Sequence, residues 1–249
     1  MSRISICNIP VDPLTMQETI QLIDKAIIER RPIHHVVINA AKVVNAQNDE
    51  ALKESIVSCD IINADGQAIV WAARFLNNRL PERVAGIDIM ENLVKLAAEK
   101  KYRIFFLGAK EEVVKEVVNI YSKKYGKEII AGYRNGYFNN EEECAVAKQI
   151  ADSGASILFV AMSSPKKEIF LNTYKYLIQT PFIMGVGGSF DVVSGLVKRA
   201  PMWMQKTGLE WFYRVMQEPG RMWKRYLFGN SKFIYLVLNE KRKQIFRIK

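Results

Sequence analysis

Short apolar runs alternate with longer segments of helical periodicity along the first four-fifths of the chain. The runs are rich in Val, Ile and Phe and predict strands at 34–40, 59–66, 102–109, 155–162 and 181–187. Helical patterns follow three of them, at 41–58, 67–76 and 110–126. Because strands that alternate with helices need crossover connections, the sequence predicts an α/β fold: a mainly parallel sheet with helices on both faces.

Small or polar residues follow each predicted strand. They are Asn39, NADG (63–66), Gly108, SSPKKE (163–168) and GVGGSFD (185–191). In a parallel sheet, ligands bind beyond the carboxyl ends of the strands. These residues are therefore expected to line one shared cleft.

The glycines of the segment GVGGSFD allow the backbone to approach a ligand in the cleft closely. Gly187, Gly188 and Ser189 could offer N–H groups to phosphate or ribose oxygens, and Asp191 could accept from a ribose or a base. The segment fits neither the dinucleotide fingerprint nor the P-loop pattern. A simple tight turn is an equally good interpretation.

Three charged residues are candidates for catalysis, each with a simpler alternative. Asp65, with Gly66 after it, could be a general base at a strand end, or only the N-cap of the next helix. Arg83 could act in the cleft or be a solvated loop residue. Lys167 could meet an anionic ligand or belong to a helix start behind Pro165. Tyr137, in the turn NGYF, leads to an aromatic anchor.

Composition limits the other chemistries. The three cysteines are far apart, which favours reduced thiols, and the only histidines are His34 and His35. Neither a metal site nor a cofactor is therefore expected. There is also no D-x-D triplet to hold a divalent cation against a nucleotide diphosphate, so side-chain cations would have to offset such a charge.

The charge is concentrated at one end of the chain. Residues 198–249 hold 13 of the 36 Lys and Arg residues, but only 3 of the 26 Asp and Glu residues, and thus the whole net charge of +10. This division predicts a body, 1–197, and a basic, aromatic-rich C-terminal appendage, 198–249. Such a surface suits a polyanion, either anionic lipid or nucleic acid.

Within the appendage, the helical spacing breaks at Pro219 and Gly220. Arg221, Lys224 and Arg225 then share one helix face, beside large apolar residues. This is typical of an amphipathic element at a membrane surface, although a helix that docks its aromatics on the body is the alternative. No apolar run reaches the roughly 20 residues of a membrane span, and no signal peptide is evident, which predicts a cytoplasmic location.

Taken together, the motifs resemble the WecG/TagA/CpsF glycosyltransferase family, carbohydrate-active family 26. The resemblance covers residues 4–235 and rests on NADGQAIVWAARFL, LPERVAGIDIMENL, FFLGAKEEV, GYRNGYF, VAMSSPKKEIF and the segment from GVGGSFD to LFGN. It implies a Rossmann-like fold and inverting, metal-independent transfer from a UDP-sugar to a polyprenyl-diphosphate-linked sugar. It also implies a peripheral location on the inner face of the cell membrane. Known members transfer N-acetylmannosamine or its uronic acid in teichoic acid, common antigen, capsule or exopolysaccharide synthesis.

The resemblance also implies roles for individual residues. Asp65 matches the proposed catalytic base, Asn39 a pocket residue and Arg83 a motif arginine near the reacting sugar. Arg214 and Arg221 match basic residues thought to close over the diphosphate, with Lys224 and Arg225 beside them.

Some features depart from the family pattern or stay open. Lys167 and Ser163 replace the usual glutamine and glycine, and Val37 stands where some members have threonine, which leaves the donor sugar open. A homo-oligomer also stays open. A nucleic-acid-binding module and a non-catalytic membrane scaffold are the rival interpretations.

Overall fold

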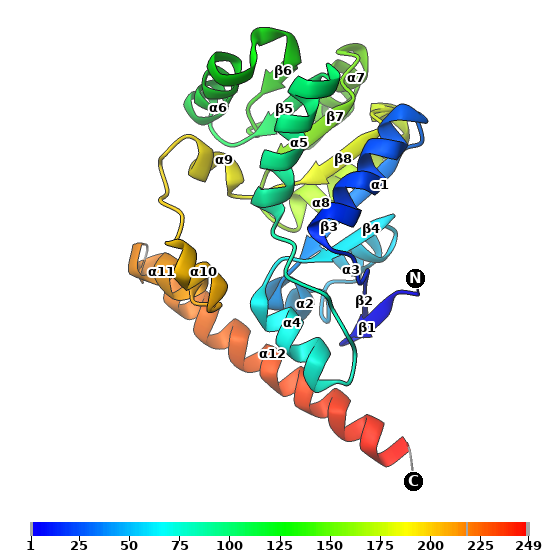
Figure 1. The fold of residues 1–249 in the computed structure, drawn as a ribbon, viewed down its shortest axis with the longest axis vertical. Helices are drawn as coiled ribbons and strands as arrows, with labels where there is room; N and C mark the ends of the chain where they lie inside the picture. The colour runs from blue at the N-terminus through cyan, green and yellow to red at the C-terminus, as the bar shows by residue number, and fades with distance from the viewer. Residues whose placement is uncertain (1, 218, 248–249) are drawn as a thin grey trace.

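The computed structural model describes residues 2–217 and 219–247 (Figure 1). The side chains of Lys206, Arg221, Met222, Lys224, Arg225, Tyr226 and Arg247 lie outside the described part. Its main sheet consists of β3 (Ile33–Ile38), β4 (Ile61–Ala64), β5 (Ile104–Gly108), β6 (Ile130–Arg134), β7 (Ile157–Ala161) and β8 (Phe182–Gly185). The strand order is β4-β3-β8-β7-β5-β6, and every neighbouring pair is parallel. The predicted α/β class is confirmed.

Helices cover both faces of this sheet. One face carries α1 (Met16–Ile28), α5 (Gly86–Lys100), α6 (Glu111–Tyr125) and α9 (Ser189–Val193). The other carries α2 (Ala40–Asn45), α3 (Glu50–Val57), α4 (Gln67–Phe75), α7 (Glu143–Asp152) and α8 (Lys166–Ile178). Because successive strand residues point to opposite faces, Phe106 packs under α6 while its neighbour Phe105 packs under α7.

A small antiparallel hairpin precedes the main sheet. Its strands are β1 (Ile4–Ile6) and β2 (Ile9–Val11). The two turn residues, Cys7 and Asn8, have φ of 51° and 61°, as the tight turns preferred in hairpins require. The hairpin joins the core formed by α2, α3 and α4. Short 3-10 turns, η1 (Lys127–Ile129) and η2 (Asn140–Glu142), precede β6 and α7.

Two local predictions need correction. The segment 41–58 is not one helix but two, α2 and α3, because the Asp49 side chain accepts from Leu52 N and starts a second helix. Residues 130–134, for which no strand was expected, form the sheet-edge strand β6. This strand is only half-buried and therefore lacks the continuous apolar run that reveals the inner strands.

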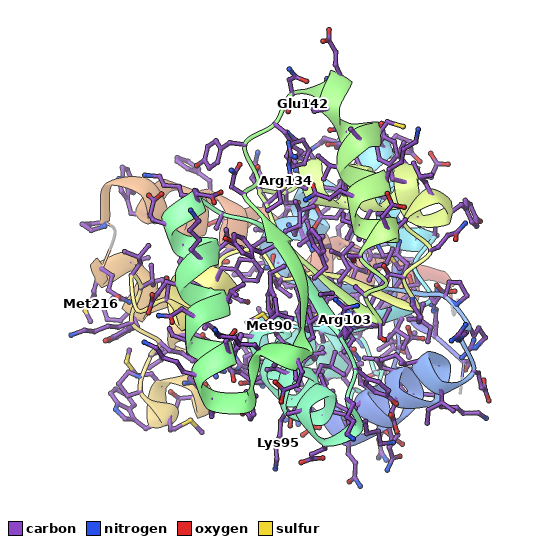
Figure 2. The ribbon with its side chains drawn as sticks, turned by 90° about the horizontal axis from the view of Figure 1, so that it is seen from above. Met90, Lys95, Arg103, Arg134, Glu142 and Met216 are labelled. Atoms are coloured by element: carbon purple, nitrogen blue, oxygen red, sulfur yellow. The ribbon has the colours of Figure 1, made fainter. Side chains whose placement is uncertain are left out.

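The C-terminal fifth consists of α10 (Met202–Lys206), α11 (Glu210–Gln217) and the long α12 (Pro219–Arg247). The expected change at Pro219 stays a prediction, since Glu218, between Gln217 of α11 and Pro219 of α12, lies outside the described residues. In Figure 1, α12 runs along one end of the molecule, with α10 and α11 beside its N-terminal half. Met216 of α11 lies at the periphery in Figure 2 and is exposed.

Candidate active site

A cavity of about 1660 Å³ opens at the carboxyl ends of the strands. Its wall includes Asn39 after β3, Asp65 after β4, Ala109 after β5, Met162 after β7 and Gly187 after β8. The volume exceeds the 300–1,000 Å³ typical of a site for one small ligand. It therefore has room for more than one small ligand.

The predicted catalytic and substrate-binding residues meet in this cavity, whereas Gly108, which was also expected in the cleft, does not line it and Ala109 does. Those whose side chains the structure describes all line it: Asn39, Asp65, Gly66, Arg83, Tyr137, Lys167, Gly187, Gly188, Ser189, Asp191 and Arg214. The side chains of Arg221, Lys224 and Arg225 lie outside the described residues. The cavity wall also includes Lys42, Arg199 and Glu210, which the sequence analysis did not single out.

Asp65 is half-buried at the end of β4 and is not a helix cap. The N-cap of α4 is Gly66, and Asp65 Oδ1 instead accepts from Gly86 N, at the start of α5, at 3.3 Å. Burial raises the pKa of Asp65, while the positive charge of Arg83 opposes that rise. The carboxylate thus becomes more basic than a solvated aspartate, as a general base requires.

Arg83 is a partly buried member of an ion pair rather than a solvated loop residue. Its Nη1 lies 2.6 Å from Glu210 Oε2 of α11, and the two side chains are 15% and 26% exposed. The loop that carries Arg83 is tied to β4, since Val84 N donates to Ala64 O at 2.8 Å. Strand β4 and this loop therefore hold Asp65 and Arg83 on the same part of the wall.

Lys167 belongs to a buried triad of charges. Glu168 Oε1 lies 2.8 Å from Lys167 Nζ and 2.9 Å from Lys42 Nζ. Burial opposes ionisation of Glu168, but the two ammonium groups hold its pKa down, at about 2. Two cations of the cavity wall, Lys42 and Lys167, therefore share this carboxylate.

Little in the amino-acid sequence indicated this triad. Lys42 sits on the first turn of α2, where its Nζ also donates to Val37 O at 2.7 Å. The sequence feature that could have indicated Lys42 is its position three residues after Asn39, near the end of a strand. Gly185 has a packing role here, because a Cβ atom at this position would lie 2.9 Å from Lys167 Cδ.

The GVGGSFD segment forms the turn between β8 and α9. Gly187 has φ +55, which favours glycine, and nothing stands within 4 Å of a Cβ built there. A Cβ on Gly188 would lie 3.7 Å from Asp191 Oδ2 and 3.9 Å from Arg214 Nη2. The loop thus brings bare backbone, a carboxylate and a guanidinium together, whereas the Ser189 hydroxyl is used internally and donates to Val186 O at 2.8 Å.

Asn39 and Tyr137 contribute in different ways. Asn39 is the N-cap of α2, and its Oδ1 accepts from Lys42 N at 3.0 Å, so its side-chain oxygen has a structural use. Tyr137 is 72% exposed at the rim of the cavity. The neighbouring Phe138 is the buried anchor that the turn was expected to lead to.

Several helices begin at this cavity without a side-chain cap. In the part of the chain that the structure describes, no side-chain cap bond is made by the N-cap residues of α4, α6 and α8, which are Gly66, Lys110 and Pro165, whereas Gly86 N of α5 donates to Asp65 Oδ1. By contrast, α1 and α3, which begin elsewhere, are capped by Thr15 and Asp49. Uncapped helix N-termini offer N–H groups and the positive end of the helix dipole, which suits an anionic ligand.

Among residues 2–217 and 219–247, no group of three or more His, Cys, Asp or Glu side chains could hold a metal ion. The fold and this cavity define an α/β protein with a cavity at the carboxyl edge of a parallel sheet, where positive charges and helix N-termini suit an anionic ligand.

Comparison with known proteins makes this class specific. The model of the WecG/TagA/CpsF glycosyl transferase family matches residues 4–247, so the chain belongs to this family and is a glycosyltransferase. A Bacillus subtilis (strain 168) protein is 38% identical over 248 residues, 99% of this chain and 95% of that protein. It is named N-acetylglucosaminyldiphosphoundecaprenol N-acetyl-beta-D-mannosaminyltransferase. A Bacillus spizizenii (strain W23) protein of the same name is 38% identical over 185 residues, 74% of this chain and 70% of that protein.

Proposed function

We propose that this chain transfers an N-acetylmannosaminyl group from a UDP-activated donor to N-acetylglucosaminyl-diphospho-undecaprenol, in the synthesis of a cell-wall or extracellular polysaccharide. The strongest support is the name that the two relatives share, together with the carboxylate of Asp65 in the wall of the cavity. The size of the cavity is consistent with a nucleotide sugar and the head of a lipid-linked acceptor side by side.

In this proposal Asp65 is the general base. Its carboxylate takes the proton of the acceptor hydroxyl as that oxygen attacks the anomeric carbon of the donor. The bond from that carbon to the diphosphate breaks, UDP leaves with the bonding electrons, and the anomeric configuration inverts. The raised pKa of Asp65 supports this role, because the proton affinity of an ordinary carboxylate is low.

Protein cations would offset the charge of the departing UDP. Arg83, Lys167 and Arg214 line the cavity, and the uncapped helix N-termini add positive potential. Arg221, Lys224 and Arg225 would join them from α12. Asp191 and Tyr137 would contact the nucleotide, and Asn39 the sugar. The reaction would then proceed without a metal ion, and EDTA would leave turnover unchanged.

A lipid-linked acceptor would require the enzyme to work at a membrane surface. No helix of the described residues is both long and apolar enough to cross one. We propose that the appendage, 198–249, attaches the body, 1–197, to the anionic inner face of the cell membrane. The excess of basic residues in 198–249 and the exposed aromatic residues of this segment support such attachment.

The test is a transfer assay with UDP-N-acetylmannosamine and a short-chain polyprenyl-diphosphate-N-acetylglucosamine. Wild-type protein should form the disaccharide lipid, and Asp65→Asn should lower kcat about a hundredfold or more. UDP binding by Asp65→Asn, measured by thermal shift, should stay close to wild type. Absence of product with this donor, but transfer from another UDP-sugar, would overturn the sugar assignment.

A further inference from the structure

Two ion pairs join the C-terminal segment to the body beside the cavity. Glu210 of α11 pairs with Arg83 at 2.6 Å. Arg199 pairs with Asp88 of α5 through its two terminal nitrogens, Nη1 and Nη2, at 2.6 and 2.8 Å. Arg83, Glu210 and Arg199 line the cavity. The two ion pairs therefore differ: the pair formed by Glu210 includes Arg83, a predicted catalytic residue, and the pair between Arg199 and Asp88 includes none.

The backbone fixes the place of Glu210. Gly208 has φ +74, and a Cβ atom on it would lie 3.0 Å from Gln67 Cγ and from Trp71 Cη2 of α4. Leu209 N donates to Met204 O at 2.8 Å, so the turn before Glu210 is closed. Helix α4 begins at Gln67, two residues after Asp65. The same helix therefore locates both the carboxylate at the strand end and the first turn of α11.

The charges around Asp65 come from separate elements. Arg83 of the loop after α4 and Lys42 of α2 favour its ionised form, while Glu210 of α11 opposes it. Arg199, just before α10, also feels the charges of Asp65 and Glu210. By pairing with Arg83, Glu210 both fixes that guanidinium and offsets its charge.

We propose that Glu210 is a positioning residue for the transfer reaction: through its ion pair it holds Arg83 at a fixed place in the cavity and offsets the charge that Arg83 presents to Asp65. The C-terminal segment thereby contributes a carboxylate, and not only cations, to the site. This role rests on the proposed function of Asp65 as the base.

Three variants separate this role from mere docking. Glu210→Gln removes the charge and keeps the shape, Glu210→Asp keeps the charge, and Asp88→Asn breaks the second ion pair with an equivalent change. In Glu210→Gln the partner of Arg83 is lost, so Arg83 can turn its full charge toward Asp65. The proton affinity of Asp65 should then fall.

The first readout needs no turnover. Carbon-13 NMR of the aspartate carboxyl groups follows the titration of Asp65 in the full chain, with the resonance assigned by Asp65→Asn. We expect the titration to move to lower pH in Glu210→Gln and to stay near wild type in Asp88→Asn and Glu210→Asp. An unmoved titration in Glu210→Gln, or an equal shift in Asp88→Asn, overturns the proposal.

The second readout is the pH profile of kcat in the transfer assay. Because the base must be ionised, the acid limb should move to lower pH in Glu210→Gln, and kcat at neutral pH should fall about tenfold or more. Glu210→Asp should recover most of that loss. If wild-type protein fails to transfer the sugar while the NMR shift is present, the proposed reaction is wrong and the coupling of Glu210 to Asp65 stands. If transfer occurs and the acid limb of Glu210→Gln is unmoved, the coupling is wrong and the reaction stands.

Discussion

His34 and His35 are consecutive residues of β3 and have no role in the proposed chemistry. Both are buried, and His35 Nε2 lies 2.8 Å from Asn63 Oδ1 of β4. Burial lowers the pKa of His34 to about 3 and that of His35 to about 4. The folded protein therefore keeps both rings neutral at pH values where an unfolded chain would protonate them.

This difference predicts a loss of stability in mild acid. Near pH 7.5 neither state binds these protons. Below pH 6.5 only the unfolded state does, so each histidine should lower the free energy of unfolding by about 1 kcal/mol at pH 5.5. Urea unfolding at pH 7.5, 6.5 and 5.5 measures the loss.

The matched control is the double variant His34→Gln, His35→Gln, whose amides do not titrate. Its free energy of unfolding should change less between pH 7.5 and 5.5 than that of wild type, whatever its absolute value. Equal losses in the two proteins would show that other groups cause the effect.

At this scale the sequence predicted where site residues lie better than what they contact. Asp65, Arg83 and Lys167 were found because strand ends and loops of a parallel sheet converge. Their partners Glu210 and Lys42 were not, because Glu210 is distant in sequence and Lys42 resembles any lysine on a short helix. An ion pair between residues far apart in the sequence leaves no local sequence pattern that predicts it.

At the scale of elements, α12 has two distinct halves. In the C-terminal half, Phe233 and Val237 are buried in the core beside α2, and Glu240 Oε2 accepts from Cys7 N of the hairpin turn at 2.5 Å. In the preceding part, Leu227 and Phe228 are exposed. Helical spacing predicted one amphipathic element here, but only packing shows which part is anchored.

Neighbouring residues on this helix give a direct test. Phe233 is 4% exposed and Ile234 is 58% exposed. Phe233→Ala should lower the free energy of unfolding by about 3 kcal/mol, because it leaves a cavity against α2. Ile234→Ala should stay within about 0.5 kcal/mol of wild type. Similar effects of the two changes in urea unfolding would mean that α12 does not dock through Phe233.

At the scale of the whole molecule, large apolar side chains are exposed on the same segment that carries the excess positive charge. Trp203, Phe212, Leu227 and Phe228 are between 44% and 61% exposed, and the net charge of +10 belongs to residues 198–249. The alternative in which aromatic residues dock on the body therefore does not describe Trp203, Phe212 and Phe228, whereas it does describe Phe233. A surface that is both basic and apolar fits an anionic membrane better than an oligonucleotide, which would favour stacking platforms in a groove.

Vesicle binding distinguishes these two polyanions. Trp203→Ala with Phe212→Ala should weaken binding to vesicles of anionic phospholipid about tenfold for each residue, because each ring loses apolar contact worth roughly 1.5 kcal/mol or more. Tyr176→Ala, which removes an 83% exposed aromatic residue of α8, is the matched control and should bind as wild type does. Neutral vesicles should bind weakly, since the basic residues then gain little. If the three proteins bind anionic vesicles equally, or prefer a single-stranded oligonucleotide, the appendage does not attach the enzyme to the membrane through this face.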